Sequence, residues 1–194
     1  MSKQNLKLRT YVTIGMLSSI AFLLMLIKFP LPGLPVFLQI DFSDVPPLIA
    51  AITMGPIAGI LVEVIKNLLD WIFSGTPTGI PVGHLANLAT GILFILPAYY
   101  IYKKFNSIKG LLVGLVVSTV IMSVGMSVLN YFVFLPMYSY FLNYDMGNFL
   151  LLAVTGILPF NLIKGILLMF VVLVLFRTMK KWIQHQQAQY LFQK

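Results

Sequence analysis

Ionisable and amide side chains stand inside stretches of this sequence that are otherwise apolar. Four of them, Glu63, Lys66, Asn67 and Asp70, recur at three- and four-residue steps, so in a helix they would share one face. Single polar groups stand apart in later apolar stretches: His84, Asn87, Asn130, Asn161 and Lys164. Such groups are costly in hydrocarbon and normally face a bundle interior or a cavity. The pattern therefore predicts either a polar binding site or polar contacts between helices.

The sequence offers little that could support catalysis. It has no cysteine, which excludes disulfides, thiolate metal sites and cysteine nucleophiles. The two histidines, His84 and His185, are too few for a histidine metal site, and no Ser/His/Asp arrangement is present. No phosphate-binding Gly-x-x-x-x-Gly-Lys-Ser/Thr motif occurs, so the chain cannot drive itself with ATP. We expect neither an enzyme nor a metal protein.

Composition sets the environment of these polar groups. Of the 194 residues, 59% are hydrophobic and 9% are charged, with a mean hydropathy of +0.95. A soluble domain carries about 25% charged residues. The chain is therefore expected to be an all-α integral membrane protein surrounded by the lipid bilayer. Its net charge of +8 does not indicate nucleic acid, because the basic residues stand at the ends of apolar runs.

The apolar runs predict six transmembrane helices in one bundle, forming a single membrane domain over residues 1–194. About 20 apolar residues cross a bilayer, and the second run is shorter than that. It begins at Pro46 and Pro47, which the first turn of a helix tolerates. Residues 136–148 are expected to form an aromatic-rich loop. The expected helices cover approximately 11–27, 45–54, 56–73, 82–102, 111–134 and 149–176.

The distribution of lysine and arginine predicts the orientation in the membrane. With six spans, ten of the 13 basic residues fall on the side of the two termini, and only Lys28 falls on the other. Positive residues stay on the cytoplasmic side. We therefore expect a multi-pass protein with both termini in the cytoplasm.

In that orientation the buried polar groups, Glu63 excepted, lie in the outer half of the membrane. A channel would need polar groups along its whole depth, so the pattern favours a pocket that opens outward and is closed below. Structural explanations stay open. The charges of residues 63–70 could neutralise one another, Lys164 could pair with a distant acid, and Asp41 and Asp44 could cap the second helix.

Small residues mark one face of the first helix. Gly15 and Ser19 form a small-xxx-small pair, which allows another helix to approach closely. Such a pair also occurs between helices of one chain.

Three segments carry a resemblance to a known family. They are residues 37–46 (FLQIDFSDVP), 55–59 (GPIAG) and 63–69 (EVIKNLL). With the length and the lysine in the last helix, they resemble the riboflavin-specific S-component of energy-coupling factor (ECF) vitamin transporters. The resemblance implies a bacterial membrane subunit that binds riboflavin from outside, with the loop after the first helix as a lid. A transmembrane coupling subunit and two ATP-binding-cassette ATPases would then drive its delivery inward. Riboflavin would be a transported substrate, and no cofactor is implied.

The resemblance gives the polar and aromatic residues expected roles. Apolar and aromatic side chains would pack on the flat flavin ring, amides would meet its imide edge, and further polar groups would bind the ribityl hydroxyls. Gly15 and Ser19 stand where the family has an Ala-x-x-x-Ala motif that contacts the coupling subunit. The expected ring contacts are Phe37, Leu38, Trp71 and Tyr131, the expected edge contacts are Asn87 and Asn130, and the expected ribityl contacts are Asp70, Asn161 and Lys164.

Two other functions stay open on the sequence. One is an S-component for thiamin, biotin or folate. A cationic thiamin would favour acidic groups over Lys164, whereas the carboxylate of biotin would favour a lysine. The other is a structural membrane protein in which the polar cluster only holds helices together.

Overall fold

The computed structural model describes residues 3–35, 37–76, 78–143 and 145–191, and within them the chain is mainly helical. A short antiparallel pair, β1 (Phe29–Pro30) with β2 (Gln39–Ile40), follows the first helix. Two π-helical segments, Asn130–Phe134 and Ala153–Ile157, join α5 to α6 and α7 to α8. The helices are α1 (Lys3–Leu26), α2 (Val45–Met54), α3 (Pro56–Ser74), α4 (Val82–Phe105), α5 (Ile108–Leu129), α6 (Leu135–Leu142), α7 (Phe149–Leu152), α8 (Leu158–Thr178) and α9 (Lys180–Leu191).

The expected all-helical membrane fold is confirmed, but the count of six spanning helices is not. In the described ranges, four continuous helices are long and apolar enough to cross a membrane: Leu8–Leu26, Val82–Phe105, Ile108–Leu142 and Phe149–Thr178. The short α2 has ten residues. The longer α3 carries Glu63, Lys66 and Asp70, which lower its hydropathy.

Two segments differ from the sequence prediction. The expected loop over 136–148 is helical as far as Leu142, since Pro136 lies in the first turn of α6, where its missing N–H is tolerated. The chain also continues after Arg177 into α9, a polar helix that buries Ile183. Its polar face concealed it from a search for apolar runs.

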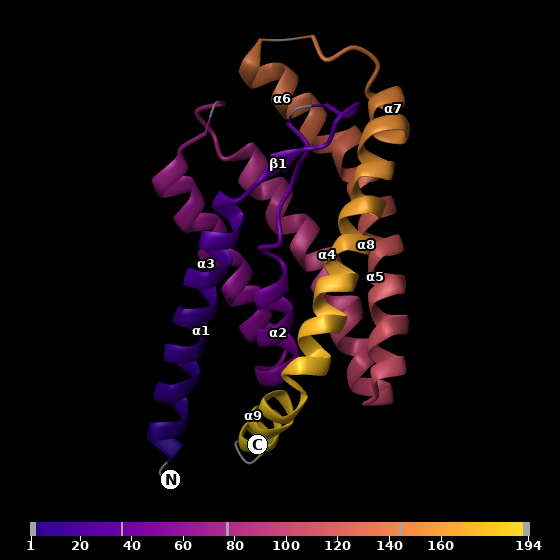
Figure 1. The fold of residues 1–194 in the computed structure, drawn as a ribbon. Helices are drawn as coiled ribbons and strands as arrows, with labels where there is room; N and C mark the ends of the chain where they lie inside the picture. Colours follow the sequence, from indigo (N-terminus) through magenta and orange to yellow (C-terminus); the bar gives the residue numbers. More distant parts are fainter. Residues whose placement is uncertain (1–2, 36, 77, 144, 192–194) are drawn as a thin grey trace.

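Figure 1 shows α1 beginning and α9 lying at one end of the molecule, here called the terminal end. The β1–β2 pair, α6 and α7 lie toward the opposite, distal end. The shorter α2 packs against α1, α3, α4 and α9, while α5 packs against both α4 and α8. Small residues allow neighbouring helices to approach one another closely. A Cβ on Gly59 would stand 2.7 Å from Ala51 Cβ, and one on Gly114 would stand 2.9 Å from the Ala98 carbonyl oxygen.

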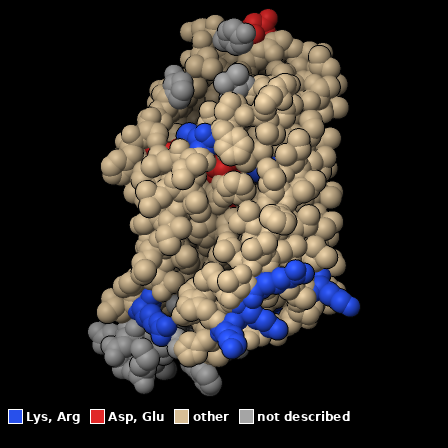
Figure 2. All heavy atoms as spheres, in the orientation of Figure 1, with Lys and Arg blue, Asp and Glu red and all other residues tan. Residues whose placement is uncertain are grey.

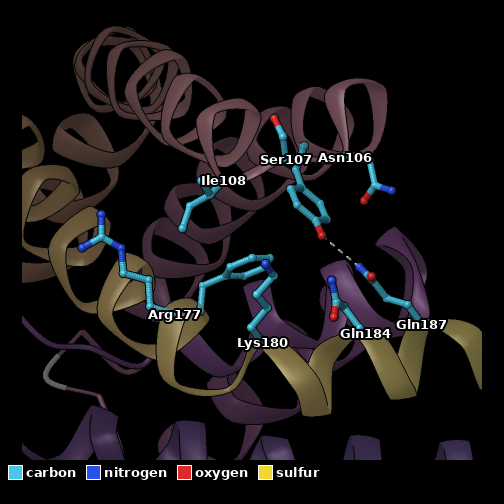
Figure 3. Close-up of a pocket in the computed structure, with 9 residues that line it drawn as sticks. Asn106, Ser107, Ile108, Arg177, Lys180, Gln184 and Gln187 are labelled. Atoms are coloured by element: carbon cyan, nitrogen blue, oxygen red, sulfur yellow. Dashed lines mark hydrogen bonds between the residues drawn. The ribbon is translucent and has the colours of Figure 1, made fainter.

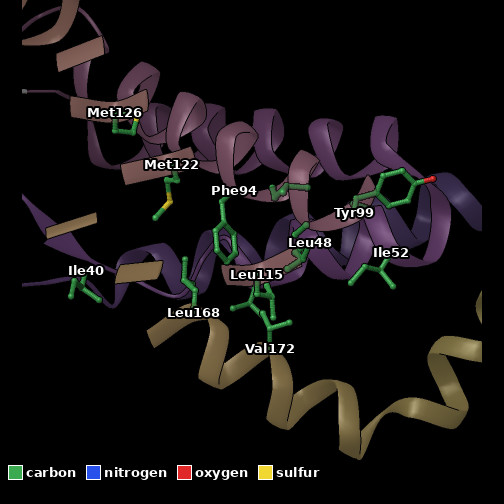
Figure 4. Packing of buried hydrophobic residues seen from close by; sticks show 14 of the residues in the cluster. Ile40, Leu48, Ile52, Phe94, Tyr99, Leu115, Met122, Met126, Leu168 and Val172 are labelled. Carbon is green, nitrogen blue, oxygen red and sulfur yellow. The ribbon is translucent and has the colours of Figure 1, made fainter. Parts of the chain in front are cut away.

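The core lies where α2, α4, α5 and α8 meet (Figure 4). Leu48, Phe94, Leu115 and Leu168 are fully buried there. Apolar side chains cover much of the exterior between the two ends. Lys and Arg gather at the terminal end, and a smaller group of charged side chains is visible toward the distal end (Figure 2). A lipid-facing belt explains this exterior.

Candidate binding site

A cavity of about 110 Å³ lies toward the distal side of the helix bundle. Its walls come from the segment before β2 and from α4, α5, α6 and α8. Segments up to 127 positions apart in the sequence therefore form one site. The lining residues are Phe37, Leu38, Gln39, Gly83, Ala86, Asn87, Thr90, Met126, Asn130, Tyr138, Phe160, Asn161 and Lys164.

One face of α4 supplies a polar wall. Gly83, Asn87 and Thr90 are three or four positions apart, so they lie one above the other on one face of the helix, where Asn87 and Thr90 supply the polar side chains. Thr90 donates its hydroxyl to the Ala86 carbonyl at 2.8 Å. The Asn87 Oδ1 is buried and accepts no hydrogen bond from the described residues. A buried acceptor without a donor is uncommon, and a ligand donor in the cavity would satisfy it.

The opposite wall contains two further amides next to irregular helical turns. Asn130 begins the π-helical segment after α5, and its Nδ2 donates to the Met126 carbonyl at 2.8 Å. Asn161 follows the second π-helical segment, and its Nδ2 donates to the Ile157 carbonyl at 2.9 Å. Both side chains are buried. Each bond fixes the orientation of its side-chain amide. The Oδ1 atom therefore points away from the backbone carbonyl that accepts the hydrogen bond from Nδ2.

The irregular turns have a local cause. Pro136 and Pro159 lie in the first turns of α6 and α8 and cannot donate to the carbonyl four residues earlier. The preceding turns widen into π-helix, a form frequent at functional sites. The two widened segments pack against one another, which places Asn130 and Asn161 on the same cavity.

Aromatic side chains close the cavity on the side of the β1–β2 pair. The rings of Phe37 and Tyr138 are 5.9 Å apart, and Phe37 is 37% exposed. Leu38 is buried behind them, and Phe160 lies on the α8 side. The cavity thus combines apolar surface with amide groups.

Lys164 connects the cavity to a buried ion network. Its Nζ lies 2.9 Å from Asp44 Oδ2 and 3.3 Å from Asp41 Oδ2. An ammonium has three donors, so with two carboxylates bound it retains one for a ligand. The long-range acidic partner that the sequence left open is thus Asp41 together with Asp44. Lys164 also lines the cavity.

Lys66 completes the network from α3. It forms ion pairs with Asp44 and, at 2.9 Å, with Glu63, and it donates to the Ser43 hydroxyl at 2.8 Å. Ser43 in turn donates from its backbone N–H and its hydroxyl to Asp41. The five charged members, Asp41, Asp44, Glu63, Lys66 and Lys164, are all buried.

The network changes the interpretation of two acids. Asp44 precedes α2, but its side chain makes no capping hydrogen bond, and Asp41 binds Ser43 and Lys164. The alternative in which these two side chains cap α2 is therefore wrong. A buried carboxylate needs charged or hydrogen-bonding partners, and these two acids have them in Lys66, Lys164 and Ser43. The network ties the segment carrying Phe37 and Leu38 to α3 and α8.

Six of the nine expected ligand residues lie on the cavity: Phe37, Leu38, Asn87, Asn130, Asn161 and Lys164. The other three do not line it. Trp71 and Tyr131 are exposed, at 41% and 37%, on the outside of the bundle. Asp70 belongs to a separate cluster with Ser74 at 2.7 Å, His84 at 3.0 Å and Lys28 at 3.5 Å.

Sequence reasoning missed seven lining residues. Gly83, Ala86 and Thr90 share the α4 face with Asn87, so helical spacing from that amide would have found them. Phe160 and Gln39 adjoin expected site residues. Tyr138 lies in the segment that was expected to form an aromatic-rich loop, and Met126 is an apolar residue within an apolar helix, so nothing in its type marks it. The missed set is Gln39, Gly83, Ala86, Thr90, Met126, Tyr138 and Phe160.

Gly15 and Ser19 lie on the exposed face of α1. The Ser19 hydroxyl donates to the Gly15 carbonyl at 3.0 Å, and a Cβ on Gly15 would meet nothing within 4 Å. The buried face of α1 carries Ile14, Ser18 and Ala21 instead. The small pair therefore does not serve packing within the described part of this chain.

Fold and site together define a class: a helical membrane protein that encloses a small-molecule cavity lined by amides, one ammonium and aromatic rings. Over the described ranges no three His, Asp or Glu side chains are arranged to hold a metal ion. The arrangement is suited to binding a flat, partly polar molecule.

Comparison with known proteins identifies the family. The family of the ECF transporter substrate-specific component matches residues 9–176. The riboflavin transporter FmnP of Bacillus subtilis is 49% identical over 189 residues, covering 96% of this chain and 100% of that protein. The riboflavin transporter RibU of Staphylococcus aureus is 48% identical over 175 residues, covering 89% of this chain and 91% of that protein. A solved S-component of a bacterial ECF transporter superposes with a TM-score of 0.79 at 45% identity, covering 91% of this chain and 98% of that one. The chain belongs to the family of ECF transporter substrate-specific components.

Proposed function

We propose that this protein is the riboflavin-binding membrane subunit of an ECF transporter. It captures the vitamin from outside the cell and delivers it inward with an ATP-driven module. The observation that carries the proposal is the cavity in which Asn87, Asn130, Asn161 and Lys164 meet aromatic side chains. Its relatives named as riboflavin transporters support the choice of vitamin.

The cavity offers partners for each part of riboflavin. The flavin ring packs against Phe37 and Leu38, and its imide edge needs both donors and acceptors, which an amide supplies together. Asn87 and Asn130 serve that edge, and the unpartnered Asn87 Oδ1 accepts the imide N–H. Asn161 and the remaining donor of Lys164 bind the ribityl hydroxyls. We assign ligand contact to the six expected residues that line the cavity.

Binding requires the cavity to widen. Small-molecule sites usually have volumes of about 300–1,000 Å³, whereas this one holds about 110 Å³. Phe37 is the exposed member of the aromatic pair. We infer that the segment around Phe37 and Leu38 moves outward as a lid, while the ion network holds its far end at Asp41 and Asp44.

We infer that the whole chain forms one membrane domain with both termini in the cytoplasm of a bacterial cell. The basic residues of the terminal end support this orientation. The cavity then opens toward the exterior, as capture requires. We infer that α3 also crosses the bilayer, and that the ten-residue α2, which is too short to cross alone, makes up the sixth span together with the segment that precedes it.

Energy comes from other subunits, because the sequence carries no ATP-binding motif. We propose that a transmembrane coupling subunit, itself driven by two ATP-binding-cassette ATPases, packs on the exposed Gly15/Ser19 face of α1. The free space beside Gly15 supports this contact. Riboflavin is the transported substrate, and the protein catalyses no reaction.

Riboflavin uptake into vesicles containing the complete transporter tests the proposal. ATP-dependent uptake is expected with the wild-type protein. With Gly15→Leu, uptake should be lost while the isolated subunit still binds riboflavin, because the new side chain fills the approach surface without reaching the cavity. Ile57→Leu, a substitution at an exposed position of α3, is the matched control and should transport normally.

The outcomes separate the parts of the proposal. Normal uptake with Gly15→Leu would remove this face of α1 from the partner contact. Uptake of thiamin, biotin or folate in place of riboflavin would reject the assigned vitamin. The absence of uptake of any of them, with the subunit folded and the complex assembled, would support a structural role.

A further inference from the structure

A second and larger cavity lies at the terminal end, away from the vitamin site. It has a volume of about 520 Å³ and lies between the α4–α5 turn, the end of α8 and α9. Figure 3 shows Lys180, Gln184 and Gln187 projecting from α9 toward the α4–α5 turn. The lining residues are Tyr102, Asn106, Ser107, Ile108, Phe176, Arg177, Lys180, Gln184 and Gln187.

Helix α9 forms one wall of this cavity, and hydrogen bonds to α2 and α4 hold it in place. Gln187 Nε2 donates to the Ile52 carbonyl at 3.0 Å and to the Tyr102 hydroxyl at 3.4 Å. Ile183 is buried one turn earlier. Since α9 packs on α2 through these contacts, the cavity is part of the fold and not a gap beneath a detached helix.

The cavity carries two positive charges that the protein does not neutralise. Arg177 and Lys180 form no ion pair with a described residue. The chain has only five acidic residues. Four of them belong to the central ion network or the Asp70 cluster, and Asp145 lies between α6 and α7 toward the distal end. No described acidic side chain therefore offsets these two charges, which leaves them available to an anion.

The remaining wall fits a phosphate ester. Ser107 caps the start of the 22-residue α5, so the positive end of that helix dipole faces the same cavity as the two cations. Arginine binds phosphate oxygens through paired N–H donors, and lysine acts as a point charge. Gln184 and Asn106 offer further donors. Tyr102, Ile108 and Phe176 provide apolar surface for the part of the ligand that carries the phosphate.

We propose that this cavity binds an anionic phosphate group between Arg177, Lys180 and the start of α5. The phosphate belongs either to the headgroup of an anionic phospholipid or to a soluble phosphate compound. The position at the end of the lipid-facing belt favours the phospholipid, because basic pockets between helices at the membrane boundary bind anionic headgroups. The site does not depend on the identity of the vitamin.

Thermal unfolding of the purified full-length protein tests the proposal. Its midpoint is measured in detergent with added phosphatidylglycerol, with added phosphatidylcholine, and with inorganic phosphate. A ligand that binds only the folded state raises the midpoint. We expect phosphatidylglycerol to raise it and phosphatidylcholine to leave it unchanged, and the double variant Arg177→Gln/Lys180→Gln to lose the increase.

The matched control is Lys103→Gln/Lys104→Gln, which removes two charges at the same end. These lysines lie over the rings of Tyr99 and Phe105 and do not line the cavity. This variant should keep the response to phosphatidylglycerol. Riboflavin binding, measured separately, should be unchanged in both double variants and shows that each is folded.

Three results decide the proposal. If inorganic phosphate raises the unfolding midpoint, and only the Arg177/Lys180 variant loses this increase, the site binds a soluble phosphate. If both double variants lose the increase in midpoint equally, general charge attraction explains the effect and the proposal is overturned. No increase with phosphatidylglycerol or phosphate in the wild type would overturn it as well.

Discussion

Polar side chains from separate parts of the sequence meet at one cavity in this protein. Asn87, Asn130 and Asn161 come from three different segments, yet each presents a buried amide to one cavity. Lys164 adds a charge that Asp41 and Asp44 already balance. Under the proposed function, the lysine would offer a donor to the vitamin without adding an uncompensated charge to the site.

Replacement of Asn130 by alanine should weaken riboflavin binding by about 1–3 kcal/mol, as expected when a buried ligand group loses its partner. Tyr131→Ala is the informative comparison, since the sequence alone placed Tyr131 on the flavin ring, whereas its side chain is exposed. It should leave the affinity unchanged. Titration of both purified variants measures the difference, and a larger loss in Tyr131→Ala would contradict the site.

Replacement of Lys66 by methionine should destabilise the protein by about 3–5 kcal/mol, because Asp44 and Glu63 would remain buried without their cation. The control is Lys28→Met, which removes a partly exposed ion pair worth about 0–1 kcal/mol. Thermal unfolding of the two variants compares them. If they unfold alike, the network does not support the fold as described.

Helices and their irregularities set the positions of these side chains. The starts of α2 and α3 were predictable because Pro46, Pro47 and Pro56 stand where a first turn tolerates proline. The continuation of the fifth expected helix beyond Phe134 into α6 was not, because the prolines usually found at helix ends, here Pro136, suggested a loop, and a π-helical turn leaves no mark in hydrophobic periodicity.

The contents of the site were predictable only in part. Amide side chains inside apolar stretches are energetically costly, so they could be recognised as candidates from the sequence. All three of the amides expected to bind ligand lie on the cavity. The pairing of Lys164 with Asp41 joins residues 123 positions apart. Such a contact depends on how α8 packs against the segment before α2, and the spacing of residues within one helix cannot supply it.

The α2–α3 contact depends on a glycine. Gly59→Ala should lower the thermal midpoint, because the new Cβ would stand 2.7 Å from Ala51 Cβ and 2.9 Å from the Pro47 carbonyl oxygen. Gly15→Ala is the control. It has free space around it, and alanine is the better helix former by about 1 kcal/mol, so its midpoint should not fall. Equal midpoints for both variants would show that α2 and α3 separate at no cost.

The whole molecule combines three regions with different environments. An apolar exterior faces lipid, a distal cavity is lined by amides and rings, and the terminal end carries cations without acidic partners. The central ion network links α3 and α8 to the segment before α2, and its member Lys164 lines the distal cavity. This division fits a subunit that captures a vitamin at one side and meets lipid and partner subunits elsewhere.

Riboflavin titration of the purified wild-type protein tests the central claim most directly. The protein is separated from bound flavin, and quenching of riboflavin fluorescence is followed with thiamin, biotin and folate as competitors. We predict tight, saturable quenching with one riboflavin per chain that none of the competitors reverses. A folded protein that leaves riboflavin fluorescence unchanged would contradict the account.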